Sequence, residues 1–205
     1  MQVLLKLSRA IDWFTSLVGR WVIWLILAST IISAVNAIVR KVFNTSSNAY
    51  LEVQWYLFAA SFLIAAGHTL LSGEHVKIDV IYGRLSRRTQ NAIDIFGFVV
   101  FLLPVCAVVL WFGVPFFLQG LQSGEMSSNA GGLIRWPVYL MIPVGFALLT
   151  LQGLSELVKR IAFHQGLIED PVVRKGEKSA EELLAEEIRR LADEKAAQAQ
   201  AQGRA

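Results

Sequence analysis

The chain has 205 residues, of which 55% are hydrophobic and only 17% are charged, whereas soluble domains carry about 25% charged residues. Charged residues are absent from four stretches of 19 to 24 residues, namely 21–39, 53–73, 95–118 and 136–155. This pattern excludes a soluble globular domain, a disordered chain and a disulfide scaffold, because about 20 apolar residues are what a helix needs to cross a bilayer. The sequence therefore predicts an all-α membrane protein with four transmembrane helices.

Residues 1–20 are predicted to form an amphipathic helix that lies at the membrane interface and runs into the first span. Apolar side chains recur at helical spacing on one face, and charged residues lie off that stripe. The stripe comprises Leu4, Leu7, Ile11, Phe14 and Val18, and the charged residues are Lys6, Arg9 and Asp12. A signal peptide cleaved near Val35 and Ala37 is the competing interpretation. It fits less well, because its apolar part would exceed the usual stretch of about 7–15 residues.

The four spans make up one transmembrane domain over residues 21–160. The segment before the first span and the three segments that connect the spans are each only about 20 residues long or shorter. They leave no room for a soluble catalytic domain, and they contain no motif for nucleotide binding, serine hydrolysis, zinc proteolysis or dithiol redox chemistry. An enzyme is not expected. Because the basic residues form no continuous patch, nucleic acid is not an expected partner either.

Polar residues gather at the adjoining ends of the first two spans. Arg40 and Lys41 follow span 1, and Glu52 precedes span 2. A carboxylate at a membrane boundary is stabilised when it meets a cation, so Glu52 is predicted to pair with these basic residues or to contact a partner subunit. Asn36 lies four residues before Arg40 on the same helical face, and polar residues in a span usually face protein rather than lipid.

His68 is the only ionisable residue well inside a predicted span. An interhelical hydrogen bond is the expected role, and a proton relay is the alternative. A haem site is not expected, because a membrane haem anchor normally needs paired axial ligands and the spans hold one histidine. No cofactor is therefore predicted.

Residues 73–83, with the sequence GEHVKIDVIYG, form the most distinctive segment. His75, Lys77 and Asp79 alternate with apolar residues, which indicates an extended or interfacial stretch that packs against the helix ends. Glu74, His75 and Asp79 fall short of the four ligands of a structural metal site, so no metal is predicted. The helix that leads to span 3 is expected to begin at residues 86–88.

Basic residues predict that both termini lie in the cytoplasm, because cytoplasmic loops are enriched in Lys and Arg. That side would hold Lys6, Arg9, Arg20, Lys77, Arg84, Arg87, Arg88, Lys159, Arg160, Arg174 and Lys175, and the other side only Arg40, Lys41 and Arg135. Residues 161–205 are a charged cytoplasmic tail, and Ser179 with Glu182 predicts a helix start within it. That helix is either solvated or docks a partner. The outer loop, residues 120–135, is polar and glycine-containing, which predicts a mobile surface loop.

Taken in order, these residues resemble the small permease subunit of tripartite ATP-independent periplasmic (TRAP) transporters, the DctQ-like family. The resemblance runs from Leu25 to Lys159, and the segment around His75, Lys77 and Asp79 is its most specific part. The other matching residues are Asn36, Arg40, Phe43, Glu52, Leu57, Phe58, Leu85, Ser86, Arg88, Arg135, Trp136, Pro137, Tyr139, Pro143 and Gly145. The chain departs from the family pattern in its longer charged tail and in the order Arg135-Trp136-Pro137.

The resemblance implies a multi-pass subunit in the lipid of the bacterial inner membrane. Its implied partners are a large multi-span permease, which holds the substrate and sodium sites, and a periplasmic solute-binding protein that delivers an organic acid or related solute. The small subunit would be a fixed scaffold for the moving large subunit and would help to form the periplasmic docking surface. The residues leave two other functions open, a membrane anchor of a redox enzyme and an autonomous four-span carrier. The carrier is disfavoured, because no span holds a buried carboxylate or is visibly broken in two.

Overall fold

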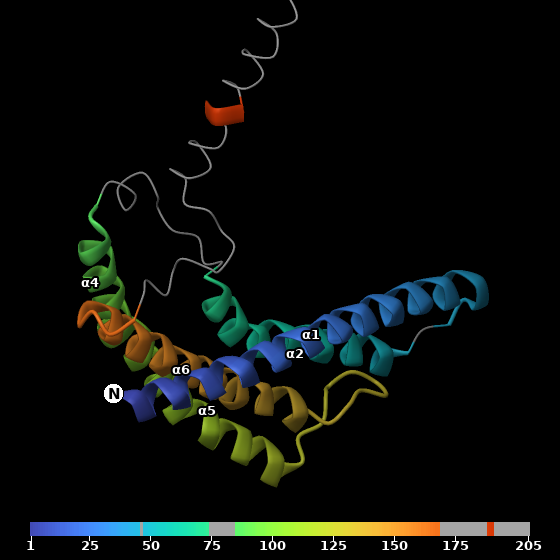
Figure 1. The fold of residues 1–205 in the computed structure, drawn as a ribbon. Coiled ribbons are helices and arrows are strands. Elements are labelled where there is room, and N and C mark those ends of the chain that lie inside the picture. The colour runs from blue at the N-terminus through green and yellow to red at the C-terminus, as the bar shows by residue number, and fades with distance from the viewer. Residues whose placement is uncertain (46, 74–84, 169–187, 191–205) are drawn as a thin grey trace, which may run out of the picture. The chain divides into compact units, whose positions relative to one another are not determined.

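The computed structural model describes residues 1–45, 47–73, 85–168 and 188–190. The chain divides into two units, residues 1–168 and residues 169–205. The helices labelled in Figure 1 all belong to the first unit. They are α1 (Gln2–Phe43), α2 (Asn48–Ser72), α4 (Arg87–Gly97), α5 (Leu103–Ser123) and α6 (Trp136–His164), with the π-helix η1 (Phe98–Leu102) joining α4 to α5.

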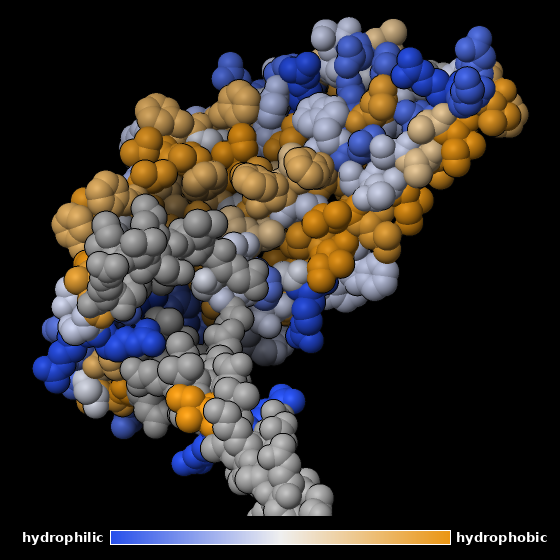
Figure 2. All heavy atoms as spheres, turned by 90° about the horizontal axis from the view of Figure 1, so that it is seen from above, coloured by the Kyte–Doolittle hydropathy of each residue, from blue (hydrophilic) through white to orange (hydrophobic). Residues whose placement is uncertain are grey.

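Four helical segments are long and apolar enough to cross a membrane, and they confirm the predicted fold. They are α1, α2, the continuous run from Arg87 to Ser123, and α6. Large apolar side chains point outward, as shown by Trp21 at 66% and Phe62 at 73% exposure. Figure 2 shows broad apolar patches on one face, bordered by hydrophilic residues. A hydrocarbon-like exterior suits lipid or another membrane helix rather than water.

Helices α2 and α6 pack against each other, and they run in the same direction through the bundle. Helix α1 packs on both of them, and α5 packs on α6 (Figure 1). The backbones of α2 and α6 approach closely at Gly145, where a Cβ atom would lie 2.7 Å from the carbonyl oxygen of Leu63. Small residues at such crossings let membrane helices pack by close contact, since the hydrophobic effect does not drive association in lipid.

Helix α1 is one continuous helix of 42 residues, in which the predicted N-terminal helix runs into the first span without a break near residue 20. At 1.5 Å per residue it is roughly 60 Å long, about twice the thickness of the hydrocarbon core. In its first half the small polar residues Ser8 and Thr15 are buried, whereas Leu7 and Phe14 of the apolar stripe are exposed. The stripe is therefore an outward face, and its position at the membrane interface stays a prediction.

The ends of the other helices agree in part with the sequence. Helix α4 begins at Arg87 as predicted, and the hydroxyl of Ser86 caps it by accepting a hydrogen bond from the backbone N–H of Thr89. Helix α6 continues to His164, past the predicted limit of the transmembrane domain at residue 160. In the tail, residues 188–190 are helical. The predicted helix start at Ser179 and Glu182 lies outside the described residues.

Candidate functional site

The connection between α5 and α6, residues 124–135, is a short hairpin. The backbone N–H of Ser127 donates to the carbonyl oxygen of Leu133, and that of Arg135 donates to Glu125, both over 2.9 Å. Gly131 has a φ of 69° at the turn, in the left-handed region that glycine adopts without strain. The segment lies on the surface as predicted, and these backbone bonds give it a defined turn. Its mobility stays a prediction. The end of the bundle that carries it is called the hairpin end below.

Glu52 of α2 holds the hairpin through its buried carboxylate, which is only 2% exposed. It accepts hydrogen bonds from the backbone N–H of Leu133 at 2.6 Å, the amide of Asn129 at 3.0 Å and the hydroxyl of Ser127. Hydrogen bonds to an ionised acceptor are roughly twice as strong as neutral ones. Gly132 leaves room for this contact, since a Cβ atom there would lie 2.9 Å from the Glu52 carboxylate.

Two further residues of α2 contact the same hairpin. The side-chain amide of Asn48 donates to the carbonyl oxygen of Ala130 at 2.9 Å, and the hydroxyl of Tyr56 donates to that of Ile134 at 3.0 Å. Asn48, Glu52 and Tyr56 are spaced four residues apart, so they lie on one face of the helix. Three successive turns of α2 thus fix the position of the hairpin.

The predicted pairing of Glu52 with Arg40 or Lys41 was wrong. Within the described residues Glu52 forms no ion pair with either, because the hairpin supplies three donors to its carboxylate. Arg40 and Lys41 are exposed at the end of α1. Together with Asn36 they line an open pocket of about 440 Å³, which places Asn36 and Arg40 on one face as the sequence predicted.

Arg135 lies at the base of the hairpin, immediately before α6. Its guanidinium forms an ion pair with Glu125 at 3.3 Å, and the hydroxyl of Tyr139 donates to the same carboxylate at 3.1 Å. The neighbouring oxygen of Tyr139 raises the pKa of Arg135 above its usual value, so the guanidinium stays charged. Arg135, Glu125 and Tyr139 together close the hairpin where α6 begins.

A second polar cluster, which was not predicted from the sequence, joins the first half of α1 to α6. Asp12 accepts hydrogen bonds from Ser155 at 2.7 Å, Gln152 at 3.0 Å and Lys159 at 3.0 Å. Buried charges are tolerated when they are paired and hydrogen-bonded. The spacing of the α6 residues, three or four apart, was the available signal. The full set, called the polar seam below, is Ser8, Asp12, Gln152, Ser155, Glu156 and Lys159.

The end of α6 also binds α4. Arg160 forms an ion pair with Asp94 and lies 5.3 Å from the centroid of the Phe98 ring. Its backbone carbonyl accepts a hydrogen bond from the side-chain amide of Asn91 at 3.0 Å. Arg88, which the resemblance singled out, is exposed on the first turn of α4.

His68 packs between helices, but the predicted hydrogen bond is not formed at its Nδ1 atom. Nδ1 is buried and has no partner among the described residues. The ring lies against α1, where a Cβ atom on Gly19 would be only 2.3 Å from the Cγ of His68. The histidine therefore fills the space that a glycine leaves.

The most specific sequence segment gives no structural test. His75, Lys77 and Asp79 lie outside the described residues. In the part of the chain that the structure describes, no group of three or more His, Cys, Asp or Glu side chains could hold a metal ion.

The comparisons with known proteins agree with this architecture. The family described as tripartite ATP-independent periplasmic transporters, DctQ component, matches residues 29–163. That range runs from the second half of α1 to the end of α6, and it includes Glu52 and the hairpin. A search among curated proteins finds no match. Since the family match covers well over half of the sequence, the chain belongs to the DctQ component family of tripartite ATP-independent periplasmic transporters.

Proposed function

We propose that the chain is a non-catalytic scaffold for the large permease subunit of a sodium-coupled transporter. The observation that carries the proposal is where the buried and half-buried charges lie. Glu52 is at the hairpin end, and Asp12, Glu156 and Arg160 are at the opposite end, each bonded within the chain. A secondary carrier binds its solute and ion near the midplane, at broken helices. Among the residues that the structure describes, charges confined to the two ends support a structural role, with solute and sodium bound by the partner.

The hairpin end is proposed to face the periplasm and to help dock the solute-binding protein. Met126 is 57% exposed on the hairpin. Hydrogen bonds to Glu52, Asn48 and Tyr56 of α2 fix the position of the hairpin. A surface that is already ordered loses little conformational entropy when it binds a partner. The delivered solute is proposed to be an organic acid or a related compound, which is what the sequence resemblance implies.

Reconstitution into proteoliposomes tests the scaffold. The chain together with its large subunit and binding protein should accumulate solute when a sodium gradient is imposed. Neither the chain alone nor the large subunit alone should do so. Accumulation by the chain alone would establish the autonomous carrier instead. A haem absorption band in the purified chain would favour the redox anchor.

The docking role has its own test, in which Glu52→Gln removes the charge that holds the hairpin. Uptake should fall by about tenfold or more, because a charged hydrogen bond contributes about 1.5–3 kcal/mol. The complex with the large subunit should still co-purify. Ser128→Ala is the matched control, since Ser128 is an exposed residue of the same hairpin. Equal uptake by both variants would show that the hairpin takes no part in docking the solute-binding protein.

A further inference from the structure

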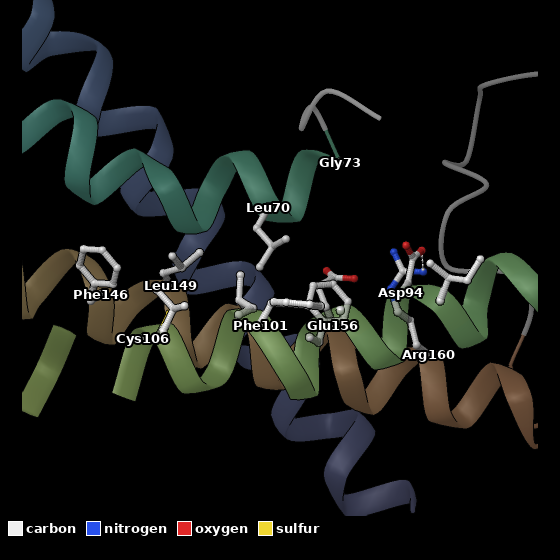
Figure 3. A pocket seen from close by; sticks show the side chains of 14 residues that line it. Leu70, Gly73, Asp94, Phe101, Cys106, Phe146, Leu149, Glu156 and Arg160 are labelled. Atoms are coloured by element: carbon white, nitrogen blue, oxygen red, sulfur yellow. Dashed lines mark hydrogen bonds and ion pairs between the residues drawn. The ribbon is translucent and has the colours of Figure 1, made fainter. Parts of the chain in front are cut away.

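A pocket of about 740 Å³ opens between α2, the α4–η1–α5 run and α6, towards the end of the bundle that carries the N-terminus. This volume is within the range of about 300–1,000 Å³ that is typical of small-molecule sites. Figure 3 shows that its lining side chains come from three separate helical segments. Neither the scaffold role nor the docking role uses this pocket.

The lining of the pocket is apolar at one end and charged at the other. Phe146, Leu149 and Cys106 lie towards one end in Figure 3, and Asp94 and Arg160 lie towards the other. A soluble anion or cation would gain nothing from the apolar part. A lipid would fill both parts, with its headgroup among the charges and an acyl chain along the apolar side chains.

Two of the charged groups retain unused hydrogen-bonding capacity. Arg160 is only 7% exposed, and its Nε atom is buried without a partner in the part of the chain that the structure describes. A buried donor without an acceptor is costly, so a ligand oxygen at this point would be stabilising. For Glu156, the amide of Gln152 and the ammonium of Lys159 both bond to Oε1, which leaves Oε2 for a further donor.

We propose that this pocket binds one molecule of phosphatidylethanolamine. Its phosphate oxygen accepts the hydrogen bond from Arg160 Nε, and its primary ammonium donates to the carboxylate of Glu156. One acyl chain lies along the apolar lining. The remaining carboxylate oxygen of Glu156, Oε2, favours a headgroup that carries a cationic donor, which disfavours a purely anionic one. A quaternary ammonium lacks N–H donors, which disfavours phosphatidylcholine.

Gly97 provides a way to fill the pocket without disturbing the helices. It lines the pocket, and a Cβ atom at this position would meet no other atom within 4 Å. A leucine there enters empty space and replaces a glycine, which is among the least favourable residues in a helix. Val108→Leu is the matched control, because Val108 is 56% exposed on α5 and is not among the pocket residues.

Native mass spectrometry of the full chain, delipidated and then titrated with phospholipids of identical acyl chains, tests the proposal. Phosphatidylethanolamine should bind about tenfold or more tightly than phosphatidylcholine or phosphatidylglycerol. Gly97→Leu should reduce this binding by about tenfold or more at unchanged helical content, and Val108→Leu should not. Retained binding in Gly97→Leu would overturn the site, and equal or tighter binding of phosphatidylglycerol would overturn the choice of headgroup.

A second variant tests the headgroup contact without removing a large side chain. Glu156→Gln keeps the size of the side chain but removes its negative charge. The preference for phosphatidylethanolamine over phosphatidylcholine should fall by about tenfold, while binding of phosphatidylglycerol should rise. An unchanged preference in this variant would show that Glu156 does not receive the ammonium.

Discussion

At the scale of single residues, the Glu52 carboxylate is the group on which the hairpin end depends. It is buried, ionised and matched by donors from the backbone of Leu133 and the side chains of Ser127 and Asn129. A charge in such a place is stabilised only while its donors remain, because burial without a partner is unfavourable. Loss of a single donor should therefore be measurable.

Ser127 and Ser128 are adjacent serines on the hairpin that allow this to be tested. Ser127→Ala removes a donor to the buried carboxylate, and it should lower the free energy of unfolding by about 1–3 kcal/mol. Ser128 is exposed, and Ser128→Ala should stay within about 0.5 kcal/mol of the original chain. Thermal or denaturant unfolding of the detergent-solubilised protein compares the two. Equal stability of the variants would mean that the Ser127 bond contributes nothing.

The residues of the candidate site were only partly predictable. Sequence position singled out Glu52 as a boundary carboxylate, but its donors lie 75 to 81 residues further along the chain. Nearness in sequence favoured Arg40 and Lys41 instead. Asp12 was recognised as lying off the apolar stripe, but no local pattern indicates that it meets Ser155 and Lys159 of α6. Contacts between distant segments depend on how helices pack, which periodicity does not encode.

At the scale of helices, close backbone contact between α2 and α6 organises the bundle. A Cβ atom on Gly145 would lie within 2.9 Å of both the carbonyl carbon and the carbonyl oxygen of Leu63. Because the obstacle is backbone rather than the end of a flexible side chain, the two helices would have to separate. In lipid, where tight packing drives association, even a small separation is unfavourable.

Gly145→Ala should therefore destabilise the bundle by about 1–3 kcal/mol, the usual range for overpacking. Gly97→Ala is the control, since Gly97 is also in a helix but its added methyl group meets nothing within 4 Å. That variant should be as stable as the original chain, or up to about 1 kcal/mol more stable, because alanine favours helix. Circular dichroism during thermal unfolding in detergent measures both. A Gly145→Ala protein as stable as Gly97→Ala would refute the close crossing.

The helices themselves were more predictable than their ends. The charge-free stretches located all four spans, because they report the length of chain that hydrocarbon can accommodate. Helix α1 nevertheless extends from Gln2 to Phe43, well beyond residues 21–39. Its flanking turns carry charges such as Asp12, which accepts a hydrogen bond from Ser155 of α6. Charge marks the limit of the hydrocarbon core, whereas backbone hydrogen bonding and packing decide where a helix ends.

At the scale of the whole molecule, the arrangement of helices makes the orientation testable. Because four spans bring the chain back to its starting side, Gln2 and Gln165 should lie on one side of the membrane and Ser128 on the other. Gln2 is at the start of α1, Gln165 follows α6 directly, and Ser128 is on the hairpin. All three residues are exposed. The sole cysteine of the sequence, Cys106, is 1% exposed. It should therefore give no background in cysteine labelling.

A membrane-impermeant maleimide should accordingly label Ser128→Cys in intact cells, while Gln2→Cys and Gln165→Cys react only after the cells are opened. This result follows if the basic residues keep both ends of the four-span unit in the cytoplasm. The unmodified chain is the control and should stay unlabelled in either condition. Labelling of the Gln2 and Gln165 variants in intact cells, with Ser128→Cys protected, would show that the chain has the opposite orientation. It would place the hairpin in the cytoplasm, where it could not dock a periplasmic protein.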